Sequence, residues 1–457
     1  MKTKEQTLSA TERKRLCIVT FARSWNGLAA VRCLGHHGIS VITGDTSRYA
    51  AASFSRYSQE HFTYPDYAED PKGFINSLLQ VVHRHYAADT DIVVMPLHNE
   101  IYTVICNKKY FDGFAHLAIP TKEQFLNTYN KRTLANLCRA YAVRTPVTRV
   151  PATREEAEKE SATLQYPVFI KIPTGSAAIG VQRVDSPDEA VERYRSLCER
   201  YELNEPDDLP IIQESVAGDD YCATFLFEHG MKRACMIYRN IACYPKHGGM
   251  GAIRETVDVP AIERIGTMFL EKMQWHGVAE IDFRWNGTDD PWLIEINPRF
   301  WGGLTQSIES GWEYPYLLYR LAVDGHVESV VPHRKNIKTW NPGLVVLLAL
   351  EDMLEAPVDH HELHQHYLRT VKETPHHTAL RDLLSRLGIV KTMPERMKMV
   401  RALLHEAEGS INEFFSWDDP FPVFGLLYPL TVYVRQGKIT PEALVGKTHL
   451  VSQEIEG

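Results

Sequence analysis

Residues 292–299 read Trp292-Leu293-Ile294-Glu295-Ile296-Asn297-Pro298-Arg299. Glu295 and Asn297 are two residues apart, so on a strand their side chains point to the same side. Two oxygen-bearing groups directed into one space suit a hard cation such as Mg²⁺. A solvated strand face is the alternative, but the apolar neighbours in this run indicate partial burial, where a carboxylate needs a partner.

A second strand precedes this one and carries a third oxygen ligand. Residues 278–284 read Val-Ala-Glu-Ile-Asp-Phe-Arg and include Asp282. The link that follows contains Asn286-Gly287 and Asp289-Asp290, which is typical of a hairpin turn. Antiparallel pairing would bring Asp282 close to Glu295 and Asn297. The sequence therefore predicts a site for Mg²⁺, with Mn²⁺ as an alternative ion.

A lysine followed by a turn of small residues stands further upstream. Residues 171–180 read Lys-Ile-Pro-Thr-Gly-Ser-Ala-Ala-Ile-Gly. Such a turn lets backbone N–H groups approach phosphate oxygens while Lys171 supplies charge. It is not a Walker A loop, because no Gly-Lys-Ser/Thr follows. Many β-hairpins contain Gly and Ser, so this loop alone is a weak signal.

The first ~120 residues alternate between strand and helix patterns. Short apolar runs at 16–20, 39–42 and 91–96 predict three strands, and residues 27–34 have helical spacing. This alternation predicts a parallel α/β sheet. The turn at 21–27 has one glycine, so the GxGxxG dinucleotide cradle is not expected.

Capping signals mark the helices that follow. Thr121 with Gln124 opens a helix predicted over 121–142. Two more helices begin after Thr153 and Ser186, and the second has Pro187 at its favoured first position. Between them the sequence predicts strands at 168–172, 181–184 and 211–213, whereas 331–457 is mostly helical in pattern.

In this order the motifs resemble those of the ATP-grasp ligases, from about residue 120 to 320 and more loosely over 15–120. The resemblance implies an α/β, ATP-grasp fold with a parallel N-terminal pre-ATP-grasp domain over 1–120. It implies linker helices and a lid subdomain over 121–217, a subdomain with the metal site over 218–330 and a helical extension over 331–457. Asn297-Pro298-Arg299 resembles the carbamoyl-phosphate-synthetase-like branch.

The same resemblance implies which residues bind ATP and metal. The nucleotide set comprises Lys131, Lys171, Gly175, Ser176, Gly180, Glu214, Val216 and Asp220. The metal set comprises Asp282, Glu295 and Asn297. Two choices stay open, because Arg132 is an alternative to Lys131 and Asp219 is an alternative to Asp220.

Two arginines are candidates for the chemistry itself. By resemblance, Arg254 lies near the transferred phosphate or the acyl substrate, with an ordinary surface charge as the alternative. Arg299 is on the metal strand. Substrate candidates in the first domain follow strands at their carboxyl ends, where ligands of α/β sheets bind; they are Arg23, His98, Asn99 and Glu100.

The resemblance implies that a carboxylate substrate attacks the γ-phosphate of ATP and becomes an acyl phosphate. An amine substrate then displaces phosphate and forms an amide. This chemistry needs no enzyme nucleophile, in agreement with the absence of a GxSxG motif. Phosphorylation of bicarbonate or carbamate is one alternative, disfavoured by a single unit without a biotin-carrier or glutaminase segment. A non-catalytic ATP-binding module is another, disfavoured by the acidic set.

Composition bounds the other function classes. The chain has 457 residues, 44% hydrophobic and 24% charged, as expected of a soluble globular protein. A net charge of −8 argues against a dedicated nucleic-acid binder. No apolar run reaches a transmembrane length and the first 15 residues lack a signal-peptide core, so we expect a cytoplasmic protein. The 8 cysteines contain no CxxC pair, which predicts reduced thiols.

Three C-terminal segments invite other readings. Residues 360–366 contain four histidines without HExxH, and a solvated helix is favoured over a zinc site. Residues 393–405 form a basic amphipathic pattern, predicted to pack on the core, with membrane or partner docking as the alternative. The aromatic segment 414–424 would pack there too, or form a homodimer or peripheral membrane contact.

Overall fold

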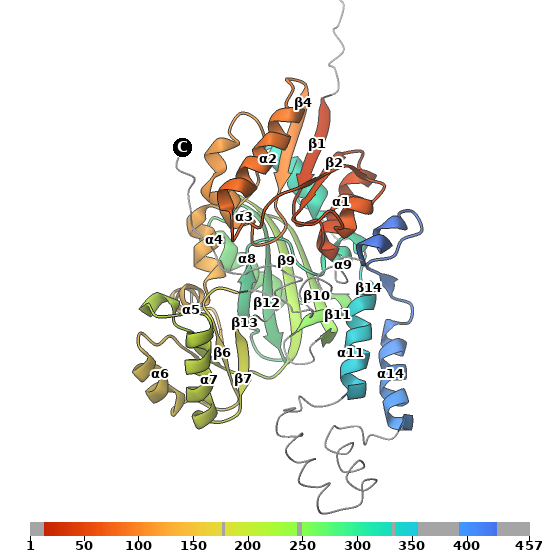
Figure 1. The fold of residues 1–457 in the computed structure, drawn as a ribbon. Helices are drawn as coiled ribbons and strands as arrows, with labels where there is room; N and C mark the ends of the chain where they lie inside the picture. The colour runs from red at the N-terminus through yellow and green to blue at the C-terminus, as the bar shows by residue number, and fades with distance from the viewer. Residues whose placement is uncertain (1–12, 176–178, 245–248, 331–333, 355–392, 427–457) are drawn as a thin grey trace, which may run out of the picture.

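The computed structural model describes residues 13–175, 179–244, 249–330, 334–354 and 393–426. Over these residues the chain forms three sheets, one parallel and two mainly antiparallel (Figure 1). The parallel sheet lies at the N-terminal end, and the longest sheet lies between it and the small lid sheet. This arrangement confirms the predicted α/β class.

The N-terminal sheet has the strand order β3-β2-β1-β4, and all neighbours pair in parallel. Its strands are β1 (Lys14–Val19), β2 (Ser40–Asp45), β3 (Ser58–Thr63) and β4 (Thr90–Met95). Its helices are α1 (Trp25–His36), η1 (Ala51–Phe54), α2 (Pro71–His85), α3 (Ile101–Cys106) and η2 (Lys108–Tyr110). The three predicted strands and the helix are confirmed. The edge strand β3 was not predicted, because its sequence Ser-Gln-Glu-His-Phe-Thr lacks an apolar run.

The single helix predicted over 121–142 is wrong. The structure has two helices, α4 (Lys122–Tyr129) and α5 (Lys131–Ala140), with Asn130 extended between them at ψ 115°. The Asn130 side chain accepts the backbone N–H groups of Arg132 and Thr133, so it caps α5. The capping box of Thr121 and Gln124 is confirmed at the start of α4.

The lid is a four-stranded antiparallel sheet with the order β5-β8-β6-β7. Its elements are β5 (Thr148–Arg149), α6 (Arg154–Ser161), β6 (Val168–Lys171), β7 (Val181–Val184), α7 (Pro187–Arg200), η3 (Pro206–Asp208) and β8 (Ile211–Glu214). The predicted caps are confirmed, since Thr153 accepts from Glu156 and Ser186 accepts from Glu189. A separate apolar core joins α6 and α7 to this sheet.

The largest sheet has seven strands in the order β13-β12-β9-β10-β11-β14-β15. These are β9 (Asp219–Glu228), β10 (Met231–Tyr244), β11 (Met250–Val257), β12 (Gly277–Trp285), β13 (Trp292–Asn297), β14 (Lys338–Trp340) and β15 (Ile411–Asn412). Helix α8 (Pro260–Lys272) covers one face, where Phe225, Phe269 and Ile281 are buried. Helices α9 (Leu304–Glu309) and α10 (Tyr314–Asp324) pack toward the N-terminal domain. The other face is apolar where Leu226, Met236 and Val278 join the core shared with α10, and it carries the polar residues Glu280 and Asp282 further along β12.

The C-terminal segment supplies strands as well as helices. It contains β14, β15, α11 (Pro342–Leu354), α14 (Met393–Ala407) and η4 (Phe421–Leu426). The helix predicted over 393–405 is confirmed, and the histidines of 360–366 lie outside the described residues. No helix in the described part of the chain is long and apolar enough to cross a bilayer.

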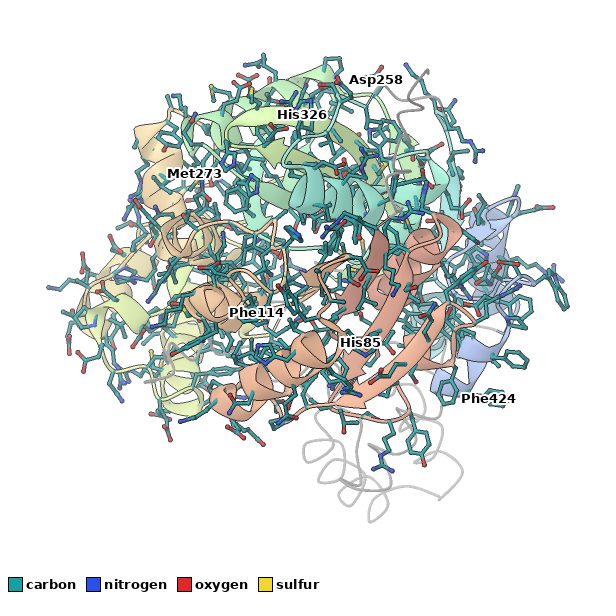
Figure 2. The ribbon with its side chains drawn as sticks, turned by 90° about the horizontal axis from the view of Figure 1, so that it is seen from above. His85, Phe114, Asp258, Met273, His326 and Phe424 are labelled. Atoms are coloured by element: carbon teal, nitrogen blue, oxygen red, sulfur yellow. The ribbon has the colours of Figure 1, made fainter. Side chains whose placement is uncertain are left out.

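The aromatic segment packs on the N-terminal domain. The ring of Phe414 meets Trp25 edge-on at 5.0 Å between centroids. The Asp419 carboxylate accepts the side chains of Arg32 and Ser55. Figure 2 shows Phe424 beside this domain, in agreement with its ring contact to Phe54. Of the predicted roles for this segment, packing within the chain is the one that the structure shows.

Candidate nucleotide and metal site

The hairpin of β12 and β13 brings the predicted acidic residues together. Asp282 pairs with Glu295, and Glu280 pairs with Asn297, in antiparallel register. Asn297 Nδ2 lies 3.3 Å from Asp282 Oδ2 and 3.3 Å from Glu280 Oε2. Alternation along each strand places all four side chains on the face away from α8. The hairpin predicted from sequence is thus confirmed, and its polar residues share one site.

Glu280 is a site residue that sequence reasoning missed. It is two residues before Asp282, the same spacing that singled out Glu295 and Asn297, so the signal was present. Ligand atoms of Glu280, Asp282 and Cys222 lie within 4.8 Å of one another. Glu280 also accepts the Tyr238 hydroxyl at 2.6 Å.

The electrostatics of this acidic set fit a divalent cation. Burial raises the pKa of Asp282 well above its ordinary value, and the charges of Glu280 and Glu295 raise it further. Burial also raises the pKa of Glu280. Burial makes Glu280 and Asp282 costly to ionise side by side, and a cation between them would stabilise their charged forms.

Asn297 turns its two amide atoms in different directions. Nδ2 faces the carboxylates, whereas Oδ1 accepts Arg299 Nη2 at 3.2 Å. An amide binds Mg²⁺ through its oxygen, so binding through Asn297 requires Oδ1 to turn toward the carboxylates or to be shared with Arg299. Asp282 and Glu295 need no such change.

Two lysines face the acidic set from other elements. Lys131 Nζ lies 4.0 Å from Glu295 Oε2 and donates to the Gly175 carbonyl at 3.0 Å. Although burial raises the pKa of the half-buried Glu295, Lys131 and Lys171 outweigh it and lower the pKa. The acid nearest the lysines therefore stays ionised, while Asp282 behind it is harder to ionise.

Lys131 and its neighbour Arg132 make different contacts, which decides between them as site residues. The Arg132 guanidinium donates to the backbone carbonyls of Pro151 and Leu209, at 3.0 Å each. It therefore fastens α5 to the lid, and Lys131 is the residue directed to the site. The break at Asn130 makes Lys131 the first residue of α5, and its N–H donates to the Pro173 carbonyl at 2.9 Å.

Lys171 ends β6 and is buried. Its Nζ donates to Gln213 Oε1 at 2.7 Å, across the β6–β8 pair. Burial lowers the pKa of Lys171 to about 8, although the Glu295 charge opposes this shift. An anion beside Nζ would favour its charged form, so the position suits a phosphate.

The loop after Lys171 begins at Gly175 and ends at Gly180, and Ser176 lies outside the described residues. Gly180 has a positive φ of 70°, and a Cβ there would lie 2.4 Å from Ile172 Cδ1. Only glycine fits this turn. The Gly175 carbonyl accepts from Lys131, which ties the loop to α5.

The segment between lid and large sheet carries the other nucleotide candidates. Glu214 ends β8 and accepts the Gln165 N–H at 2.8 Å, and Val216 is half-buried in the loop that follows. Asp220 pairs with Arg284, and the register places it on the face of Asp282. Asp219 is on the opposite face, so the structure favours Asp220 at the site.

Arg299 connects the metal strand to the N-terminal domain. Its Nη2 donates to Asn297 Oδ1, and its Nε donates to Asn99 Oδ1, at 3.2 Å each. Asn99 in turn donates to the Tyr129 hydroxyl at 2.9 Å. The structure thus brings Asn99, predicted from its place after β4, to the edge of the acidic set.

The other three substrate candidates surround the same strand ends. Burial lowers the pKa of His98 well below its ordinary value, so the imidazole is neutral, and it stacks on Phe21 at 4.5 Å between centroids. Glu100 Oε1 accepts the Thr20 hydroxyl at 2.6 Å and two backbone N–H groups. Arg23 pairs with Asp45 at 2.8 Å. Among described residues, His98 Nδ1 and Glu100 Oε2 are buried without a hydrogen-bond partner.

Arg254 does not contact the acidic residues directly. Its Nη1 lies 2.5 Å from Glu413 Oε1, and Thr339 donates to the same oxygen at 2.7 Å. Pairing with Asn240 across β10 and β11 places Arg254 on the polar face, so the surface-charge reading is wrong. Sequence reasoning missed Glu413, because nothing in its local sequence marks it and the contact spans 159 residues.

The parallel N-terminal sheet, the lid and the large sheet with its acidic hairpin together form the ATP-grasp fold, as the sequence predicts. Within it, residues 211–341 match a family described as "ATP-grasp in the biosynthetic pathway with Ter operon". The match covers β8 to β14 and includes the acidic hairpin and Arg299. The finer assignment to a carbamoyl-phosphate-synthetase-like branch stays a prediction.

Solved structures share the fold at low sequence identity. A biotin carboxylase from Campylobacter jejuni has 14% identity and a TM-score of 0.55, covering 70% of this chain and 74% of that one. An L-amino acid ligase from Bacillus licheniformis has 17% identity and a TM-score of 0.53, covering 71% and 76%. The biotin carboxylase domain dimer of Hydrogenobacter thermophilus 2-oxoglutarate carboxylase, solved with MgADP and bicarbonate, has 11% identity and a TM-score of 0.54, covering 70% and 71%. No curated protein matches the sequence.

Proposed function

We propose that this chain is an ATP-dependent ligase that activates a carboxylate as an acyl phosphate and joins it to an amine. The observation that carries the proposal is the convergence of Lys131, Lys171, Asp282 and Glu295 from α5, β6, β12 and β13. Cationic and acidic groups that face each other across a few ångströms suit a polyphosphate with its metal. The shared fold does not separate ligases from carboxylases, so the reaction type is our inference.

Asp282 and Glu295 would hold Mg²⁺ in this proposal, with Glu280 and Asn297 beside them. When bound, the ion would neutralise charge on the terminal phosphates during phosphoryl transfer. Lys131 and Lys171 would bind the phosphate oxygens as charge-assisted donors. Asp220 would accept the ribose hydroxyls, and the lid, roughly 145–215, would close over ATP and keep water off the acyl phosphate.

Arg254 and Arg299 would orient the acid. A carboxylate oxygen of the substrate forms a bond to the γ-phosphorus, and the bond from that phosphorus to ADP breaks. The amine nitrogen then bonds to the acyl carbon, phosphate leaves, and the amine loses a proton. Arginine forks match both carboxylate and phosphate geometry, so the same residues suit both steps. His98, Asn99 and Glu100 would form the wall that selects the acid.

The test is ADP release by the full chain with pools of organic acids and amines, followed by mass analysis of the products. An ¹⁸O-labelled carboxylate should transfer one labelled oxygen to the released phosphate, because the acyl phosphate bridges through that oxygen. Turnover should also require the amine. Turnover with bicarbonate alone would indicate carbamate or carboxyphosphate chemistry instead. ATP binding without turnover under any pool would indicate a non-catalytic module.

A further inference from the structure

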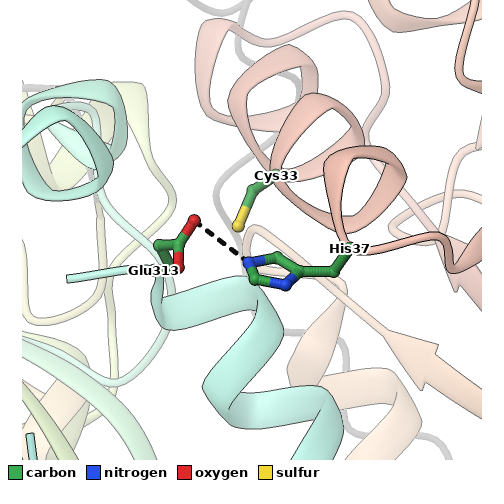
Figure 3. Close-up of side chains that lie close together, drawn as sticks. All are labelled: Cys33, His37 and Glu313. Atoms are coloured by element: carbon green, nitrogen blue, oxygen red, sulfur yellow. Dashed lines mark ion pairs between the residues drawn. The ribbon is translucent and has the colours of Figure 1, made fainter. Parts of the chain in front are cut away.

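Three metal-binding side chains meet outside the nucleotide site, between α1 and the start of α10. Cys33 is on α1, His37 follows one turn later at the end of the same helix, and Glu313 directly precedes α10. One ligand atom from each lies within 4.8 Å of the other two. Figure 3 shows the Cys33 sulfur pointing toward the gap between His37 and Glu313. We propose that Cys33, His37 and Glu313 form a Zn²⁺ site.

The His37 ring is held by stacking, and its Nε2 atom makes no hydrogen bond to the described residues. The ring stacks on Tyr316 at 3.7 Å between centroids and 5° between planes. Its Nε2 lies 3.0 Å from Glu313 Oε1, but the angles do not make a hydrogen bond. Nε2 is also shielded from solvent, without a hydrogen-bond partner among the described residues. A nitrogen held this way has its ligand position directed at the space shared with the other two groups.

Glu313 is the second unusual member. It occupies the N-cap position of α10, yet its side chain makes no capping hydrogen bond. A glutamate at a helix start ordinarily serves the first turn through its charge or its oxygens. Here the carboxylate turns to α1 instead, which favours a ligand role over a capping role.

Cys33 is the third member and comes from α1. It is only 2% exposed, and its sulfur is one of the three ligand atoms that lie within 4.8 Å of one another. Burial, with the Glu313 charge, raises the pKa of the thiol while no cation is present. Zinc would therefore bind by displacing the thiol proton, and the proton would pass to solvent.

The ligand types select the metal. A thiolate, an imidazole and a carboxylate suit Zn²⁺ better than Mg²⁺ or Ca²⁺, which prefer oxygen ligands alone. Spacing of four residues puts Cys33 and His37 on one helix face, as in helical zinc sites. Three protein ligands leave a fourth position for water. The site would fasten α1 of the N-terminal domain to the start of α10.

The experiment titrates the full chain with Zn²⁺ alone, in competition with a chromophoric chelator. We expect about one high-affinity ion per chain, with about one proton released. His37→Gln and Glu313→Gln should each weaken binding by more than about 100-fold, since loss of a ligand should exceed the 10- to 100-fold cost of losing an outer partner. The matched controls are His36→Gln, a neighbouring exposed histidine, and Cys198→Ser, a buried cysteine of the lid.

Replacing Zn²⁺ by Co²⁺ tests whether the Cys33 sulfur is a ligand. With Co²⁺ in place of Zn²⁺, the wild type should show a thiolate-to-cobalt charge-transfer band that Cys33→Ser lacks and Cys198→Ser keeps. If Cys33→Ser does not fold, His37→Gln still tests the site, because it leaves the sulfur in place and changes the band. Absence of tight zinc binding in the wild type would overturn the proposal. Wild-type zinc affinity in both His37→Gln and Glu313→Gln would also overturn it, because the ion would then be bound by other residues.

Discussion

Arg254 on β11 and Glu413 after β15 form an ion pair of 2.5 Å, with side chains 3% and 1% exposed. The pair joins the polar face of the large sheet to a segment 159 residues later. Burial tends to lower the pKa of Arg254, but the Glu413 charge outweighs it and raises the pKa. The C-terminal segment is therefore fastened to the same face of the large sheet that carries the acidic hairpin.

Loss of Glu413 should destabilise the protein. Glu413→Ala leaves a buried guanidinium without its partner, and we expect a loss of about 3–5 kcal/mol in the free energy of unfolding, measured with denaturant. The control Glu406→Ala removes an acid that pairs with Lys338 at the surface and should cost less than about 1 kcal/mol. The double variant Arg254→Met/Glu413→Leu should recover stability without recovering turnover. A double variant with wild-type turnover would remove Arg254 from the chemistry.

Glu295→Gln should abolish Mg²⁺-dependent ATP turnover and leave the fold intact. The change keeps the shape of the side chain but removes the carboxylate nearest Lys131. Turnover would be measured as ADP release and folding by thermal unfolding. Asp290→Asn is the matched control, because Asp290 is an exposed acid in the same hairpin that pairs with Arg264. Normal turnover in Glu295→Gln would remove the metal assignment.

The lowered pKa of Lys171 predicts that both the stability of the fold and the affinity for nucleotide depend on pH. Its pKa falls from 10.5 to about 8 in the folded chain, so between these values the folded lysine is neutral while the unfolded one is charged. The unfolded state then binds more protons, and stability rises with pH across this window. A bound phosphate favours the charged lysine, so nucleotide affinity should fall as pH rises above about 8, with proton uptake on binding.

Calorimetry in buffers of different ionisation enthalpy measures that uptake. Lys171→Ala should lose it and should weaken ATP binding by roughly 1.5–3 kcal/mol, the value of a charge-assisted hydrogen bond. Lys232→Ala is the control, because Lys232 pairs with Glu263 away from the acidic hairpin. Unchanged affinity in Lys171→Ala would place the phosphates elsewhere.

Gly180→Ala should destabilise the lid more than the backbone conformation alone explains. Gly113 has a similar φ of 80°, but a Cβ there meets nothing within 4 Å. Gly113→Ala therefore isolates the conformational cost, about 1–2 kcal/mol. Gly180→Ala adds the clash with Ile172, so its thermal midpoint should be the lower of the two. Equal midpoints would show that the loop can rearrange.

Local patterns sufficed where the sequence signal was itself local. The spacing of Glu295 and Asn297, the Asn286-Gly287 turn and the caps at Thr121, Thr153 and Ser186 all depend on a few neighbouring residues. The structure confirms these features because period-2 alternation and capping chemistry operate over that range.

Long-range contacts were beyond such patterns. Asn130 looked like one polar residue within a helix, yet capping of α5 competes with helix continuation and ends α4 there. Strand β3 has a polar sequence and is defined by its pairing with β2. Glu413 reaches Arg254 only because β15 pairs with β14. Which residues meet in these cases is decided by tertiary packing.

Arg299 donates hydrogen bonds to two asparagines, Asn99 after β4 and Asn297 in the acidic set. A substrate that shifts the loop after β4 would therefore pull on the same guanidinium that orients the amide beside the cation. In the proposed enzyme, a substrate at the loop after β4 and a metal beside Asn297 would therefore affect each other through the Arg299 side chain.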